Sequence, residues 1–139
     1  MGTGCRGRIL VVEDDEAVSQ PLKTRLETAG FKVHTEGSGK AGLTYAKRCE
    51  PELVILDLKL PDMSGYEVCG RLRRLYSHWI VPVLMLTGMD QPIDQLRGFA
   101  FGADAYLTKP YDPVELLKTV SLLLKKFVPE TGKGNGKDS

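Results

Sequence analysis

The sequence is short of the features that mark membrane, secreted and metal-thiolate proteins. No apolar run approaches the roughly 20 residues that a membrane-spanning helix needs, and no signal-peptide pattern precedes Arg8. The three cysteines, Cys5, Cys49 and Cys69, are far apart and form no CxxC pair. We therefore expect reduced thiols, no metal bound by cysteine, no membrane partner and a cytoplasmic location.

Large charge excess and common nucleotide-binding motifs are also missing. Lys and Arg number 19 and Asp and Glu 18, so the net charge is +1 and we expect no direct nucleic-acid binding by this domain. No GxGxxG motif follows a strand-like run, and there is no Walker loop. The stretch "EGSGKAG" (36–42) lacks the spacing of a phosphate-binding loop, and we interpret it as a helix N-cap at Ser38.

What the sequence does contain is an alternation of short apolar runs and helix-like segments. The expected strands are residues 8–13, 31–36, 52–57, 81–87 and 104–108, and the expected helices are 16–29, 39–49, 65–76, 92–102 and 112–128. Near-continuous apolar strands indicate a sheet covered on both faces, which favours parallel pairing. We predict one α/β domain over residues 8–128, doubly wound in three layers, with a five-stranded parallel sheet and five helices on both faces. Residues 1–7 are an N-terminal extension, and residues 129–139 are a flexible tail or a truncated linker.

Polar residues gather where the expected strands end. Glu13 and Asp14 follow the first strand, Asp57 the third, Thr87 ends the fourth and Lys109 follows the fifth. Because ligands of open parallel sheets bind beyond the carboxyl ends of the strands, we expect Asp57 to face a polar crevice. Clustered carboxylates without His or Cys suit Mg²⁺. Once Mg²⁺ neutralises the cluster, Asp57 can attack the phosphorus of an incoming phosphoryl group and form an aspartyl phosphate. We expect Mg²⁺, Lys109 and the Thr87 hydroxyl to stabilise the charge on the phosphoryl oxygens.

Each of these residues also has an ordinary structural interpretation. An Asp-Asp pair after a strand is a common helix N-cap, and Asp15 with Glu16 fits that role. Thr87 alone fits a strand, and Lys109 alone fits a solvated loop. Their coincidence at matching strand ends favours a phosphoacceptor site.

Four motifs identify a family resemblance. They are "ILVVEDD" (9–15), "VILDLKLPDMSGYEV" (54–68), "PVLMLTG" (82–88) and "GADAYLTKPYDPVEL" (102–116). In this order and spacing they resemble the receiver domain of two-component response regulators, from about Arg8 to Phe127. The resemblance implies a flavodoxin-like fold and a phosphoprotein switch that a histidine kinase or phosphotransfer protein loads in an Mg²⁺-dependent reaction. It implies a phosphoacceptor that catalyses its own phosphorylation and dephosphorylation and regulates an output partner, not a metabolic enzyme.

The resemblance also assigns roles to single residues. Asp57 is the phosphorylated aspartate, and Mg²⁺ is held by the acidic pair Glu13 and Asp14 together with Asp57 and the backbone carbonyl of Lys59. Thr87 is the switch hydroxyl, Tyr106 the switch aromatic residue and Lys109 the phosphate-pairing lysine. The Lys109–Pro110 bond is expected to be cis, and Gly65 fits a tight loop after the acceptor strand.

An aspartate-nucleophile phosphohydrolase on a similar fold is the main alternative. Such enzymes place an acid/base Asp two residues after the nucleophile. Lys59 occupies that position here and cannot do this work.

The last expected helix is unusually apolar. One stripe contains Leu116, Val120, Leu123 and Phe127, and a second contains Leu117, Leu124 and Val128. The second stripe either widens the core contact or forms a docking face for an effector or a second copy. The family resemblance implies an output face made of the fourth helix, the fifth strand and the fifth helix. Ala100, Ala105 and Thr119 stand where DNA-binding members often carry charge, which argues against their usual charge-paired dimer.

Overall fold

The structure is a computed structural model that describes residues 8–75, 81–88 and 102–127. Its strands are β1 (Arg8–Val12), β2 (Lys32–Glu36), β3 (Leu53–Leu56), β4 (Val83–Thr87) and β5 (Ala105–Thr108). The helices in these ranges are α1 (Glu16–Thr28), α2 (Gly39–Cys49), α3 (Gly65–Leu75) and α5 (Pro113–Phe127). Every predicted strand is present, a residue or two shorter than expected. The predicted helix at 92–102 lies outside the described residues except for Gly102.

All five strands pair in parallel, as the apolar runs predicted. The strand order is β2-β1-β3-β4-β5, so β3 occupies the centre of the sheet. In the register of β1 and β3, Val12 lies beside Leu56, and the two strands therefore end level with each other. This register brings Glu13, Asp14 and Asp57 to one edge.

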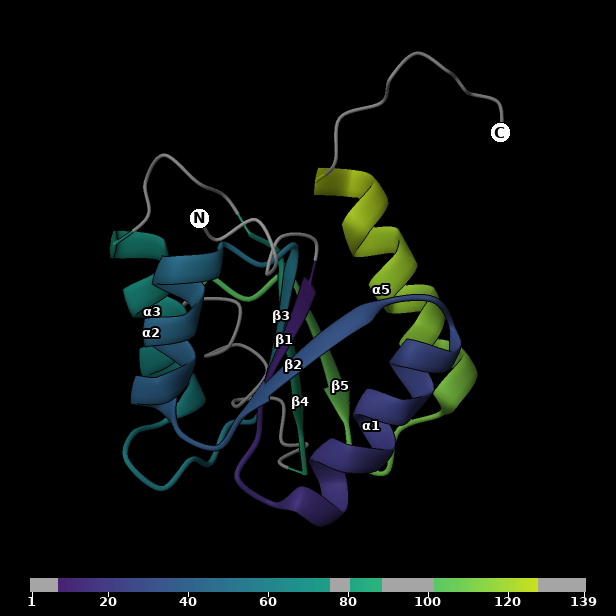
Figure 1. Ribbon diagram of the computed structural model, residues 1–139, viewed down its shortest axis with the longest axis horizontal. Coiled ribbons are helices and arrows are strands. Elements are labelled where there is room, and N and C mark those ends of the chain that lie inside the picture. The colour runs from purple at the N-terminus through teal and green to yellow at the C-terminus, as the bar shows by residue number, and fades with distance from the viewer. Residues whose placement is uncertain (1–7, 76–80, 89–101, 128–139) are drawn as a thin grey trace.

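Helices cover both faces of the sheet (Figure 1), with α2 and α3 on one side and α1 and α5 on the other. Alternate residues of β1 divide between the two cores. Leu10 and Val12 pack with residues of α2 and α3, while Ile9 and Val11 pack with residues of α1 and α5. This arrangement is the doubly wound three-layer fold that the sequence predicted.

Local side-chain contacts begin the helices. The side chain of Asp15 accepts a hydrogen bond of 3.0 Å from the backbone N of Ala17 at the start of α1. Ser38 accepts one of 3.1 Å from the backbone N of Ala41 at the start of α2. Both contacts confirm the N-caps predicted from the sequence.

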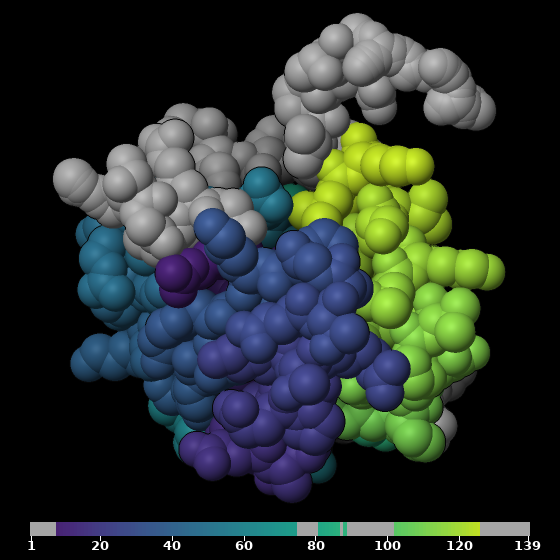
Figure 2. All heavy atoms as spheres, turned by 45° about the vertical axis from the view of Figure 1, so that its right-hand side comes forward, coloured from purple at the N-terminus to yellow at the C-terminus, as the bar shows by residue number. Residues whose placement is uncertain are grey.

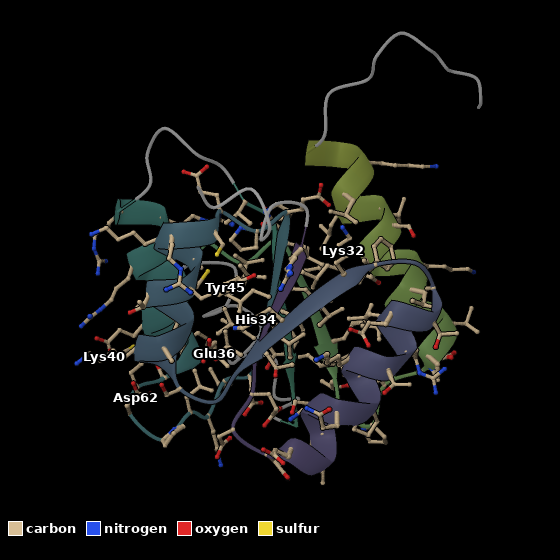
Figure 3. The ribbon with its side chains drawn as sticks, in the orientation of Figure 1. Lys32, His34, Glu36, Lys40, Tyr45 and Asp62 are labelled. Carbon is tan, nitrogen blue, oxygen red and sulfur yellow. The ribbon has the colours of Figure 1, made fainter. Side chains whose placement is uncertain are left out.

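One edge of the sheet is β2, and α2 covers one side of it. The ring of His34 stacks on Tyr45 with ring centres 3.9 Å apart, and its Nε2 lies 2.6 Å from Glu36 Oε2 (Figure 3). Tyr45 is buried, so the stacked pair covers the core at this edge of the sheet although His34 and Glu36 are polar.

The packing of α5 agrees with one of the two alternatives that its apolar stripes left open. Leu116, Val120 and Leu123 are buried, as expected of the first stripe. Leu117 and Leu124 of the second stripe are partly buried against the same core cluster. Where the structure describes side chains, the second stripe therefore widens the core contact. The exposed apolar residues of α5 are Val114 and Leu122 instead.

The expectation of three reduced thiols is wrong for one cysteine. Cys69 is free and buried on α3, but Cys49, at the end of α2, is disulfide-bonded. The remaining cysteine, Cys5, lies outside the described residues. Among the described helices, none is long and apolar enough to cross a membrane.

Candidate functional site

The candidate site lies where β1 and β3 end, at the lower edge of the sheet in Figure 1. Backbone hydrogen bonds extend the ladder past both strands: Asp57 N donates to Val12 O at 3.0 Å, and Glu13 N donates to Glu36 O at 2.9 Å. These bonds fix the backbone of both acidic residues. One carboxylate oxygen from each of Glu13, Asp14 and Asp57 lies within 4.8 Å of the others.

Lys109 reaches into this cluster from the end of β5. Its Nζ lies 2.8 Å from Glu13 Oε1 and 3.3 Å from Asp57 Oδ1. Asp57 is only 8% exposed, so it is more enclosed than the open crevice we expected, and Lys109 supplies its charged partner. Asp14 is exposed. The lysine is therefore part of the site and not a solvated loop residue.

Burial and charge act together on the site's ionisation. Burial raises the pKa of Glu13, and the nearby charge of Asp57 adds to this effect, while the hydrogen bond from Lys109 opposes it. Burial alone would lower the pKa of Lys109, but the hydrogen bond to Glu13 and the charge of Asp57 raise it overall. A raised pKa for both Lys109 and Glu13 is expected where one lysine lies among several carboxylates.

The donor set fits a divalent cation. Three carboxylates face one ammonium, so the ionised cluster of Glu13, Asp14, Asp57 and Lys109 carries two uncompensated negative charges. Carboxylate oxygens without a His or Cys among them are the ligands that hard cations prefer. These residues could therefore hold a metal ion.

The loop after β3 is folded tightly beside Asp57. Gly65 N donates to Leu58 O at 2.7 Å, and Lys59 forms an isolated bridge with Ser64. A Cβ on Gly65 would collide with the backbone oxygen of Asp57. This collision explains the glycine and confirms that it serves the tight loop.

Asp62 is a functional candidate that sequence reasoning missed. Its carboxylate accepts hydrogen bonds from the backbone N of Gly39 at 2.8 Å and of Lys40 at 2.9 Å, so it caps α2 from the loop after β3 (Figure 3). These bonds lower the pKa of Asp62, that from Lys40 first and that from Gly39 second. The PDMSG sequence around it predicts a turn, but no local pattern predicts a partner more than twenty residues away.

The other predicted site residues lie on the neighbouring strands β4 and β5. Thr87 is the last residue of β4 and pairs with Thr108, the last residue of β5. Lys109 directly follows Thr108. Tyr106 pairs with Met85 and packs against the core cluster under α2 and α3. The Lys109–Pro110 peptide bond is cis, as the resemblance implied.

A five-stranded parallel sheet with acidic residues and a lysine at its carboxyl edge is a flavodoxin-like α/β fold with a charged cluster at that edge. Residues 9–121 match the family described as the response regulator receiver domain, and the chain belongs to this family. It is 43% identical over 128 residues to the DNA-binding dual master transcriptional regulator RpaA of Synechocystis, covering 91% of this chain and 53% of that protein. It is 40% identical over 119 residues to the cell cycle response regulator CtrA of Brucella ovis, covering 86% of this chain and 50% of that protein.

Solved structures agree with this membership. The chemotaxis protein CheY4 of Vibrio cholerae superposes with a TM-score of 0.79 at 31% identity, covering 85% of this chain and 98% of that one. The BeF3-activated receiver domain of Klebsiella pneumoniae RstA gives a TM-score of 0.79 at 30% identity, with the same coverage. The chain spans about half the length of the curated relatives named above. It is a receiver domain, the phosphoacceptor switch module of two-component systems.

Proposed function

We propose that Asp57 is the phosphoacceptor of this receiver domain. The observation that carries the proposal is its position: Asp57 directly follows the central strand β3, has a carboxylate oxygen within 4.8 Å of those of Glu13 and Asp14, and contacts Lys109. Asp62 is turned to the N-terminus of α2, and Asp15 caps α1. Glu13 also contacts Lys109 and has two acidic neighbours, but Asp57 follows the central strand β3, the position that the family resemblance assigns to the acceptor.

The proposed chemistry is transfer of a phosphoryl group from a phosphohistidine. A carboxylate oxygen of Asp57 forms a bond to phosphorus while the P–N bond breaks, and the imidazole nitrogen leaves with the electron pair and takes up a proton. The product is a mixed anhydride on Asp57. Attack of water on its phosphorus later returns the carboxylate and releases inorganic phosphate, so the domain catalyses its own loading and unloading.

The chain's own groups stabilise charge during this transfer. Lys109 already contacts Asp57, so its ammonium can pair with a phosphoryl oxygen once the group is attached. The hydroxyl of Thr87 is proposed to meet another oxygen, supported by the position of Thr87 at the end of β4. Glu13 holds Lys109 in place through the 2.8 Å contact.

The metal is proposed to be Mg²⁺, held by Asp14, Asp57 and the carbonyl of Lys59, with Glu13 in the acidic set. The net charge of the cluster and its oxygen donors support this assignment. When bound, the ion offsets the repulsion between the carboxylates and the incoming phosphoryl group. The tight loop after β3 supports a fixed position for the Lys59 backbone.

The switch is proposed to couple Thr87 to Tyr106. A hydroxyl drawn toward the phosphoryl group vacates space that the aromatic ring then fills, which shifts a two-state equilibrium. The neighbouring strands β4 and β5, on which the two residues lie, support a short path between them.

The proposed partners follow from the family. A histidine kinase or phosphotransfer protein supplies the phosphoryl group, and an effector or a second copy binds the face of the fourth helix, β5 and α5. We place the domain at residues 8–128, with residues 1–7 and 129–139 as flanking segments. A cytoplasmic location remains a prediction from the family.

Phosphorylation by acetyl phosphate tests the central assignment. Wild-type protein incubated with acetyl phosphate and Mg²⁺ should gain a phosphoryl group on the tryptic peptide that contains Asp57, and Asp57→Asn should not. Asp15→Asn is the matched control, because it removes the same charge nearby and leaves an N-cap oxygen. Equal labelling of wild type and Asp57→Asn would refute the assignment.

A further inference from the structure

The turn between β2 and α2 lies against the loop that carries the acidic pair. Glu13 N donates a hydrogen bond of 2.9 Å to Glu36 O at the start of this turn. The next residue, Gly37, is close to Asp14, since a Cβ added to Gly37 would lie 3.9 Å from the Cα of Asp14. One side of the turn is therefore in contact with the backbone of both acidic residues.

The other side of the same turn is held by the loop after β3. Asp62 uses both of its carboxylate oxygens there: Oδ1 accepts from Gly39 N at 2.8 Å, and Oδ2 accepts from Lys40 N at 2.9 Å (Figure 3). Met63 packs so closely that a Cβ added to Gly39 would lie 2.5 Å from its Cγ. The turn thus joins the loop after β3 to the loop after β1.

The loop after β3 is closed by its own backbone contacts. Lys59 forms an isolated bridge with Ser64, and Gly65 N donates to Leu58 O at 2.7 Å. Asp62 lies in the stretch that the bridge between Lys59 and Ser64 encloses. A contact that holds Asp62 in place therefore also restrains the backbone of Lys59, whose carbonyl is a proposed metal ligand.

We propose that Asp62 is a positioning residue for Mg²⁺: by holding the loop after β3 on the turn, it sets the carbonyl of Lys59 relative to the carboxylate of Asp14. The inference rests on the proposed function, from which it takes the metal and its ligands. Without the contact, the loop has to be ordered when the ion binds, and the cost of ordering it lowers the affinity. Residues that orient metal ligands typically change the affinity by about 10- to 100-fold.

Two observations separate positioning from helix capping and from simple attraction of a cation. The helix α2 has a local N-cap, because Ser38 accepts a hydrogen bond of 3.1 Å from Ala41 N. Asp62 itself is exposed, and Figure 2 shows β2, in blue, on the outside of the molecule. Water and salt screen a charge at such a position, so the charge of Asp62 adds little to the attraction of a cation.

Titration of Mg²⁺ into the unphosphorylated full chain by isothermal calorimetry tests the proposal. In Asp62→Ala, the dissociation constant should rise roughly tenfold, at the low end of the effect of residues that orient metal ligands. Asp62→Asn removes the same charge but keeps one acceptor oxygen, so its affinity should fall clearly less. Ser38→Ala is the matched control, because it removes a capping bond of the same helix and leaves Asp62 in place. It should bind Mg²⁺ like the wild type.

Phosphorylation by acetyl phosphate gives an independent measurement. The Mg²⁺ concentration for half-maximal labelling of Asp62→Ala should rise by the same factor as its dissociation constant. The rate at saturating Mg²⁺ should stay near that of the wild type, because Asp57, Lys109 and Thr87 are unchanged.

The outcomes separate this inference from the proposed function. A wild type that binds no Mg²⁺ would overturn the metal assignment and this inference with it. If the wild type binds and Asp62→Ala binds equally well, the positioning role alone is wrong. Equal losses of affinity in Asp62→Ala and Asp62→Asn would assign the effect to charge, and equal losses in Asp62→Ala and Ser38→Ala would assign it to the stability of α2. Either result would also overturn the positioning role.

Discussion

At the scale of single residues, Lys109 decides how the acidic cluster can be occupied. It contacts Glu13 and Asp57 but leaves Asp14 exposed, so positive charge is supplied to one side of the cluster. The side that includes Asp14 remains available to a cation. Under the proposed function, this division would let one edge of the sheet take both a metal ion and an anionic phosphoryl group.

Thr87 is expected to affect the response to phosphorylation more than phosphorylation itself. Thr87→Ala removes the hydroxyl and leaves Asp57 and Lys109 in contact, so it should still accept phosphate from acetyl phosphate. Its amide chemical shifts around Tyr106 should change much less than those of the wild type. Thr87→Ser keeps the hydroxyl and should restore the response. Equal shift changes in Thr87→Ala and wild type would exclude this coupling.

Cys69 should be inert in the folded protein. It is buried on α3, and burial raises the pKa of its thiol to about 11, so almost no thiolate forms at neutral pH. A thiol reagent at pH 8 should modify Cys69 only after unfolding by denaturant. Peptide mapping after labelling under both conditions identifies the modified residue. Rapid labelling of Cys69 in the native protein would show that α3 opens readily.

At the scale of elements, Asp62 joins the acceptor loop to α2. Asp62→Ala removes the two hydrogen bonds to Gly39 and Lys40 and should lower the melting temperature by roughly a few °C, as expected for loss of a helix cap. Asp62→Ser keeps a capping oxygen on a shorter side chain, so its melting temperature should fall less than that of Asp62→Ala. Unchanged melting of Asp62→Ala would mean that water replaces these bonds without loss.

The pH dependence of Asp62 has a defined sign. Its pKa in the folded protein is lowered below the ordinary value of 3.8, so its stabilisation is present above that pH and is lost as the pH falls through the folded value. The difference in unfolding free energy between wild type and Asp62→Asn should therefore be constant near neutral pH and shrink below about pH 3.8. A difference that grows on acidification would contradict the direction of the shift.

The elements themselves could be predicted from the sequence, because each reflects local chemistry. Continuous apolar runs gave the parallel strands, and Asp15 and Ser38 marked the starts of α1 and α2. The contact of Asp62 with α2 could not be predicted, since it depends on segments more than twenty residues apart meeting in space. The spacing of the cysteines did not predict the disulfide of Cys49 either. Helical spacing also could not show that Leu117 packs into the core while Leu122 faces solvent.

At the scale of the whole molecule, we expect the acidic site to make stability depend on metal ions. The cluster carries two uncompensated negative charges, and any cation that binds only the folded state stabilises it. With Mg²⁺ at ten times its dissociation constant, the unfolding free energy should rise by about 1.4 kcal/mol and the melting temperature by about 5 °C.

Asp14→Asn should be at least as stable as the wild type in a chelator and less stable than the wild type in Mg²⁺. In a chelator, the variant should melt at the same temperature as the wild type or slightly higher, because it removes one of three mutually repelling carboxylates. In Mg²⁺, it should gain much less than the wild type, because a metal ligand is lost. Asp15→Asn, which removes the same charge from the neighbouring N-cap, should follow the wild type in both conditions. Differential scanning calorimetry of the three proteins measures this, and an equal gain of Asp14→Asn and wild type in Mg²⁺ would place the ion elsewhere.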